Sequence, residues 1–114
     1  MKSLKALLMG YSNTEYKTID AEEAKLMMDN QEVIIIDVRE ENEYTRGHVP
    51  NSILIPLSTI KEENDILPEK EKTILVYCRS GSRSAKAAKI LSHMGYKHIY
   101  NFGGILDWPY DIEK

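Results

Sequence analysis

The chain has 114 residues, of which 42% are hydrophobic, and carries 15 Lys and Arg against 18 Asp and Glu for a net charge of -3. This length lets one domain bury a core without disulfides or structural metal, and the charge gives no reason to expect nucleic acid or a membrane as partner. The single cysteine excludes an internal disulfide and fits a reducing compartment, which indicates a cytoplasmic protein.

Residues 1–15 begin with a basic, weakly apolar stretch in which Lys5 leaves an apolar run of only four residues. That run is too short for a secretory signal, and we predict a short amphipathic helix or extension that precedes a domain over residues 16–114. No segment approaches the ~18 apolar residues that a membrane-spanning helix needs.

The first part of the domain predicts two strands separated by a helix. Residues 16–19 form a plausible short strand, and Asp20 then begins a helix with Glu23 placed as in a capping box. Residues 33–37 are a continuous apolar run that ends in Asp37, the pattern of a central parallel strand buried on both faces. Its carboxylate is expected at the carboxyl edge of the sheet.

The middle of the chain predicts shorter elements. Residues 40–45 indicate a helical turn ended by Gly47, and residues 53–55 a strand stopped by Pro56. The polar stretch 58–72 is expected to hold a short helix.

The last part predicts a strand over 73–77, a long helix, a short strand over 98–100 and a final turn or short helix over 103–108. The helix ends near Gly95 and carries a buried stripe of apolar residues: Ala87, Ile90, Leu91 and Met94. Strands that alternate with helices at this spacing predict an α/β fold of three layers, with a mostly parallel sheet of about five strands between helices.

The lone cysteine, Cys78, follows the strand 73–77 and opens the loop Cys-Arg-Ser-Gly-Ser-Arg-Ser. A cysteine there could be an inert core residue, but its neighbours favour a nucleophilic thiolate. Arg79 and Arg83 bring two cations, Gly81 lets successive amides turn inward, and the helix that starts near 82–84 adds the positive end of its dipole. We therefore predict that Cys78 is reactive.

This loop resembles the active-site loop of single-domain rhodanese sulfurtransferases. Three further marks occur in the family's order: Asp37-Val-Arg39 with Glu43-Tyr44, Gly47-His-Val-Pro50, and Gly103-Gly-Ile-x-x-Trp108. One position departs from the family, since Asn51-Ser52 stands where Gly-Ala is usual.

The resemblance implies a ping-pong sulfur transfer without a cofactor. Cys78 would take the outer sulfur of a small-molecule donor such as thiosulfate as a persulfide and pass it to cyanide or a thiol. The substrate-binding residues would be those of the loop: Arg79, Ser80, Gly81, Ser82, Arg83 and Ser84. A sulfur relay that accepts persulfide sulfur from a partner protein, with little thiosulfate turnover, remains open as the alternative.

Loop length argues against phosphatase chemistry. Related dual-specificity phosphatases and arsenate reductases place five residues between the cysteine and the arginine, whereas four separate Cys78 from Arg83 and no histidine precedes the cysteine. The shorter ring suits one sulfur atom better than a tetrahedral oxyanion.

Four polar residues outside the loop are expected to support it. Asp37 and Arg39 have the character of a buried ion pair that braces the loops, with Glu43 completing the brace. His48 falls in a turn and is expected to bond backbone rather than act as an acid or base. The other histidines lack partners at metal-ligand spacing, so no metal site is predicted.

Overall fold

A computed structural model of the chain describes residues 15–61 and 66–114. The helix predicted in residues 1–15 lies outside this part apart from Glu15, which is in irregular structure. No helix of the described ranges is long and apolar enough to cross a membrane.

One five-stranded sheet organises the domain, and every pair of neighbouring strands in it is parallel. The order across the sheet is β1-β5-β4-β2-β3. The strands are β1 (Lys17–Thr18), β2 (Ile34–Asp37), β3 (Ile53–Leu54), β4 (Thr73–Cys78) and β5 (His98–Gly104). The predicted α/β class and the five parallel strands are confirmed.

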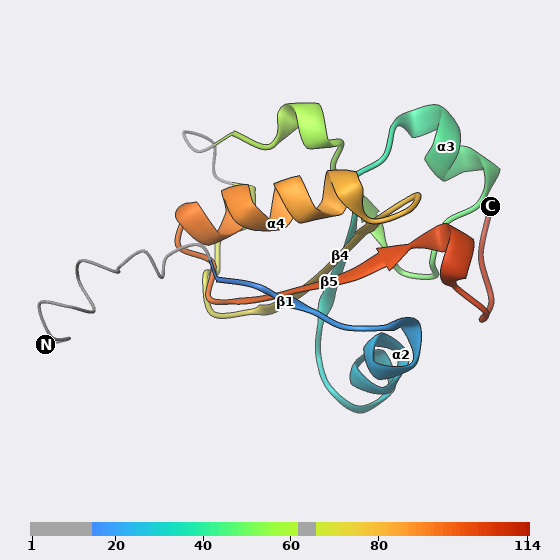
Figure 1. Ribbon diagram of the computed structural model, residues 1–114, viewed down its shortest axis with the longest axis horizontal. Helices are drawn as coiled ribbons and strands as arrows, with labels where there is room; N and C mark the ends of the chain where they lie inside the picture. Colours follow the sequence, from blue (N-terminus) through green and yellow to red (C-terminus); the bar gives the residue numbers. More distant parts are fainter. Residues whose placement is uncertain (1–14, 62–65) are drawn as a thin grey trace, which may run out of the picture.

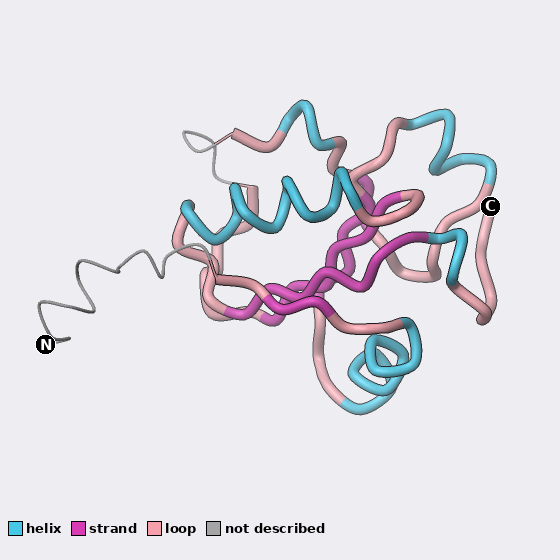
Figure 2. The backbone as a smooth tube through the Cα atoms, viewed as in Figure 1, coloured by secondary structure: helices cyan, strands magenta, loops and turns pink. Residues whose placement is uncertain are grey.

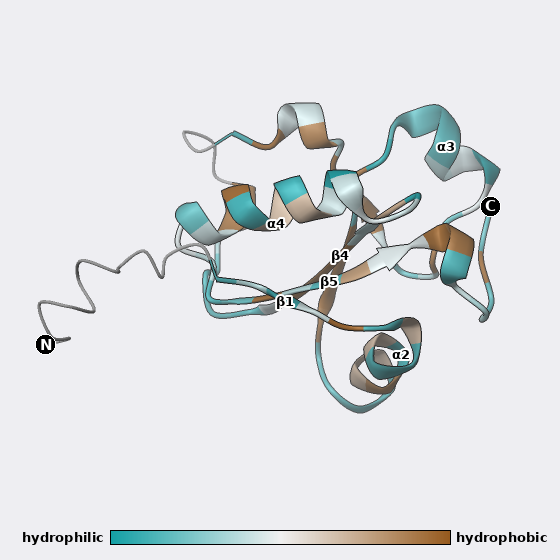
Figure 3. Cartoon of the chain, viewed as in Figure 1, coloured by the Kyte–Doolittle hydropathy of each residue, from teal (hydrophilic) through white to brown (hydrophobic). Residues whose placement is uncertain are grey.

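Helices lie on both faces of the sheet, α4 (Ser82–His93) on one and α2 (Ala21–Asn30) on the other (Figure 1). The alternation of side chains along β4 divides the core between them. Ile74, Val76 and Cys78 pack on the α4 face, whereas Leu75 and Tyr77 pack on the α2 face. Both faces of the central strands are therefore buried, and Figure 3 shows the apolar colouring of β4 between more polar helices.

Two helix starts follow their sequence signals. The carboxylate of Asp20 accepts a hydrogen bond of 2.9 Å from the amide of Glu23 and caps α2. The short helix α3 (Glu41–Arg46) begins with a capping box between Glu40 and Glu43. These local signals determine the residues at which α2 and α3 begin.

Two boundaries differ from the prediction. Strand β5 continues to Gly104 rather than ending at residue 100, because Asn101 pairs with Val76 and Gly104 pairs with Cys78 beyond a register shift in β4. Within the described part of 58–72, the expected helix is only the end of a 3-10 turn, η2 (Leu57–Thr59). Glycines and short polar runs carry little periodic signal, which explains both differences.

The departure at residues 51 and 52 is accommodated locally. Asn51 has a positive φ of 70°, a conformation that glycine adopts freely and that asparagine tolerates better than most residues. The hydroxyl of Ser52 lies 3.3 Å from that of Tyr77, inside the core. Asn51 therefore adopts the left-handed conformation that a glycine would adopt freely.

The carboxyl ends of the strands meet at one end of the molecule. There, α3, the loop before α4, the 3-10 turn η3 (Ile105–Asp107) and the C-terminus gather around the edge of the sheet (Figures 1 and 2). In parallel α/β sheets this is the edge where ligands bind.

Candidate active site

Cys78 is the last residue of β4 and is only 1% exposed. The register between β4 and β5 shifts just before it, so that Cys78 pairs with Gly104. At Gly104 a Cβ atom would lie 1.9 Å from the carbonyl oxygen of Arg79. A glycine is needed at this position, because any side chain would push β5 away from the loop that holds the sulfur.

The loop after Cys78 folds around its Sγ atom. The amide of Gly81 donates to Sγ at 3.0 Å, and the hydroxyl of Ser84 lies 3.5 Å away. Burial raises the pKa of the Cys78 thiol, but hydrogen bonds from the Ser84 hydroxyl and from the backbone of Ser84, Gly81 and Ser80 outweigh it and bring the pKa below its usual range. We call residues 78–84 the cradle; it favours a thiolate.

The cradle depends on a residue that sequence reasoning missed. The hydroxyl of Ser84 donates to the side-chain oxygen of Asn101 at 2.8 Å, and the same oxygen accepts the amide of Gly103 at 3.0 Å. Asn101 is 5% exposed. Since a hydroxyl has one proton, Asn101 and Cys78 compete for it with the carbonyls of Gly81 and Gly103, which lie 3.1 and 3.4 Å away. The signal for Asn101 in the sequence is that this polar residue stands between Tyr100 and Phe102.

The two arginines of the cradle have different environments. Arg83 makes a bidentate pair with Glu43, at 2.8 and 2.9 Å. The hydrogen bond from Arg83 lowers the pKa of Glu43 to about 2. Glu43 therefore ties α3 to the cradle, and its charge is also attracted by Arg39 of the expected brace. Arg79 is exposed, and no described residue pairs with its guanidinium.

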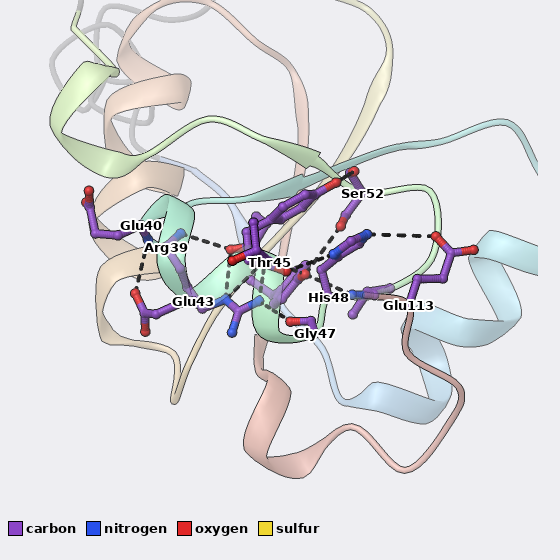
Figure 4. Close-up of polar contacts among 12 residues, drawn as sticks. Arg39, Glu40, Glu43, Thr45, Gly47, His48, Ser52 and Glu113 are labelled. Carbon is purple, nitrogen blue, oxygen red and sulfur yellow. Dashed lines mark hydrogen bonds and ion pairs between the residues drawn. The ribbon is translucent and has the colours of Figure 1, made fainter.

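A buried ion pair stands behind the cradle. Arg39 contacts both oxygens of Asp37, at 2.7 Å for its shortest bond, and donates to the carbonyl of Gly47 at 2.7 Å. The hydroxyl of Tyr77 donates to Asp37 at 2.6 Å. Burial, followed by this bond, raises the pKa of Tyr77. These contacts fasten the end of α3 to β2 and β4, and Figure 4 shows Arg39 reaching Gly47.

His48 makes its contacts with α3 and the C-terminal segment. Its Nδ1 lies 2.9 Å from the carbonyl of Tyr44, and its ring stacks on that of Tyr44 with centroids 3.8 Å apart. Its backbone pairs with Glu113 through two bonds of 2.8 Å, while Nε2 lies 3.8 Å from the Glu113 carboxylate (Figure 4). Among the described contacts, none joins His48 to Cys78.

The other cradle serines are exposed, and Ser80 acts on the sulfur through its backbone. Within the described ranges, no group of three or more His, Cys, Asp or Glu is arranged to hold a metal ion. The structure thus brings Ser80, Gly81 and Ser84 of the loop to the Cys78 sulfur, whereas the contacts of His48 are with α3 and the C-terminal segment.

Comparisons with known proteins agree with this geometry. The family model of the Rhodanese-like domain matches residues 20–109. The chain is 45% identical over 73 residues to thiosulfate sulfurtransferase PspE of Escherichia coli, covering 63% of this chain and 70% of that protein. A rhodanese-related protein of Thermoplasma volcanium has a similar crystal structure, with a TM-score of 0.75, 35% identity, and coverage of 86% of this chain and 98% of that one.

A second group of relatives is much longer than this chain. The tRNA uridine(34) hydroxylase of Photorhabdus laumondii is 34% identical over 96 residues, which is 79% of this chain but only 27% of that protein. The chain therefore spans about a quarter of the length of such relatives.

Proposed function

The chain belongs to the Rhodanese-like domain family, and we propose that it is a sulfurtransferase that carries sulfane sulfur as a persulfide on Cys78. The observation that carries the proposal is the cradle: a buried sulfur that accepts hydrogen bonds from Gly81 and Ser84 and has a lowered pKa. A thiolate is the form of cysteine that attacks sulfur. The similarity to thiosulfate sulfurtransferase PspE supports thiosulfate as a donor.

In the first half-reaction, the Cys78 thiolate attacks the outer sulfur of thiosulfate. A bond forms between the two sulfurs, the bond to the sulfonate sulfur breaks, and sulfite leaves with the electron pair. The exposed cation of Arg79 would attract the dianion, whereas the Arg83 charge is largely neutralised by Glu43.

In the second half-reaction, cyanide or a thiolate attacks the outer sulfur of the persulfide. The sulfur–sulfur bond breaks, and Cys78 recovers the electron pair as a thiolate. The inward amides of residues 79–84 would hold the negative outer sulfur between the two steps. The cytoplasm is the proposed setting, because the only cysteine must remain a free thiol between turnovers.

In the alternative function, Cys78 also forms a persulfide, but the sulfur comes from a different donor. In a sulfur relay, a partner protein delivers the sulfur to Cys78 and thiosulfate is a poor donor. Its support is the similarity to tRNA uridine(34) hydroxylases, of which this domain matches 27%.

The test is intact mass measured after incubation with thiosulfate, for the wild type and for Cys78→Ser. We expect the wild type alone to gain one sulfur atom, which cyanide then removes as thiocyanate. If the wild type gains no sulfur from thiosulfate or from protein persulfides, sulfur transfer is refuted. Gain only from a protein persulfide would favour the relay, and turnover of an aryl phosphate would overturn the loop-length argument.

A further inference from the structure

A pocket lies beside the cradle, and Arg79, the cation proposed to attract thiosulfate, forms part of its wall. The volume of this pocket is about 350 Å³, within the range of small-molecule sites. Its walls come from the end of α3, the start of the cradle, η3 and the C-terminal segment, and the residues that matter here are Arg46, Gly47, Arg79, Ile105, Leu106 and Ile112. The carbonyl of Arg79 accepts the amide of Leu106 at 3.2 Å, which joins η3 to the cradle.

Two positive charges of this pocket have no ion-pair partner among the residues that the structure describes. The other charged residues of the pocket are satisfied, because Arg39 pairs with Asp37 and Glu43 pairs with Arg83. Neither Arg46 nor Arg79 has an ion-pair partner in residues 15–61 and 66–114, and both are exposed. They reach the pocket from different segments, α3 and the cradle. In a chain with a net charge of -3, these two arginines make the lining of the pocket locally positive.

Apolar side chains also line this pocket. Leu106 and Ile112 are 59% and 47% exposed, and Ile105 is partly buried. A Cβ atom at Gly47 would lie 3.1 Å from Cδ1 of Ile112, so Ile112 packs closely against the end of α3. The site therefore offers carbon contact as well as positive charge.

Contacts within the protein order two walls of the pocket. The carbonyl of Gly47 is fixed by Arg39, and the C-terminal segment is fixed by the paired backbones of His48 and Glu113 (Figure 4). Because these contacts already order both sides of the pocket, a ligand need not supply the free energy to order them.

We propose that this pocket binds the body of a small organic thiol that carries two carboxylates, with Arg46 and Arg79 pairing with the carboxylates and Leu106 and Ile112 contacting its carbon chain. The proposal rests on the proposed function and names the class of acceptor. The acceptor thiolate attacks the outer sulfur of the Cys78 persulfide, the sulfur–sulfur bond breaks, Cys78 keeps the electron pair, and the acceptor leaves as an organic persulfide. Arginine suits this task because its fork matches a carboxylate.

The binding test uses the full chain and unreactive probes, so that it does not depend on sulfur transfer. Calorimetry compares S-methylmercaptosuccinate, a dicarboxylate, with the uncharged S-methylthioglycerol. We expect the wild type to bind the dicarboxylate, Arg46→Gln to weaken that binding at least about tenfold, and the control Lys89→Gln, which removes an exposed charge from α4, to change it less than about twofold. Absence of dicarboxylate binding by the wild type, equal binding of both probes, or unchanged binding by Arg46→Gln would each overturn the proposal.

A kinetic arm then separates the two proposals. Protein loaded with sulfur is mixed with mercaptosuccinate or with thioglycerol, and the second-order rates of discharge are compared. We expect the preference for mercaptosuccinate to fall about tenfold in Arg46→Gln and to persist in Lys89→Gln. If Cys78 cannot be loaded at all, the proposed function fails while the calorimetry still decides the pocket. If loading succeeds and the wild type shows no preference, the pocket proposal alone fails.

Discussion

Replacing Glu43 by Gln should destabilise the domain in a manner that depends on pH. The change keeps an oxygen that can accept the amide of Glu40, as Glu43 does at 3.0 Å, but removes the charge that pairs with Arg83. At about 1.4 kcal/mol for each pH unit, the fall in the pKa of Glu43 from 4.5 to about 2 corresponds to at most ~3.4 kcal/mol. The side chains of Arg83 and Glu43 are 32% and 24% exposed, and solvent screening reduces the expected loss to about 1–2 kcal/mol.

The sign of the pH dependence follows from the direction of this shift. The pKa of Glu43 is lower in the folded chain than in the unfolded one, so the stabilisation is fully present above about pH 4.5 and is lost as the pH falls toward 2. The gap between wild type and Glu43→Gln should therefore be largest near pH 7 and less than about half as large at pH 3.

Urea denaturation at both pH values measures the gap. Glu41→Gln is the matched control, because it makes the same change at an exposed position of the same helix, and it should cost less than about 0.5 kcal/mol. An equal loss in both variants, or a gap that does not change between pH 7 and pH 3, would refute the reasoning.

Two further changes test the site. Ser84→Ala removes a hydroxyl that lies 3.5 Å from Sγ of Cys78 and should raise the pKa of the thiol, so that alkylation by iodoacetamide accelerates at a higher pH than in the wild type. Ser82→Ala removes an exposed hydroxyl of the same loop and should leave the pH profile of alkylation unchanged. Identical profiles for all three proteins would contradict the role of Ser84 in stabilising the thiolate. Gly104→Ala places a Cβ atom 1.9 Å from a backbone oxygen and should lower the free energy of unfolding, measured by heat or urea, by more than about 3 kcal/mol. In Gly103→Ala the new Cβ atom meets no atom within 4 Å, but the residue has a φ of 92°, so the loss should be about 1–2 kcal/mol. Equal losses would show that a small backbone shift relieves the close approach at Gly104.

Local patterns were sufficient for much of the fold. The apolar run ending at Asp37 and the cap at Asp20 each lie within a few residues of the feature they determine, and both were predicted. Strand β5 was predicted too short because its last residues are held by their pairing with β4, as Gly104 is with Cys78. A single segment of sequence carries no information on that register.

The candidate site likewise has some features that follow from a local stretch of sequence and others that depend on the fold. The amides around Cys78 belong to one contiguous loop, so the composition of that loop was enough to place them near the sulfur. The partner of Arg83 was not predictable from spacing, because Glu43 lies 40 residues earlier and reaches the cradle only through the arrangement of the sheet. The role of Asn101 likewise depends on its pairing with Val76, which turns a strand residue toward the cradle.

The chain's only tryptophan gives one of the two layers of the core an optical signature of its own. Trp108 packs against Phe102 and Tyr110, its indole donates to the carbonyl of Asp111 at 3.0 Å, and it belongs to the cluster on the α2 face. Its fluorescence thus monitors the α2 side and the C-terminal segment, while far-ultraviolet circular dichroism monitors both helical layers together. Superimposable denaturation curves from the two signals would mean that the layer holding Cys78 and the layer holding Trp108 melt as one cooperative unit.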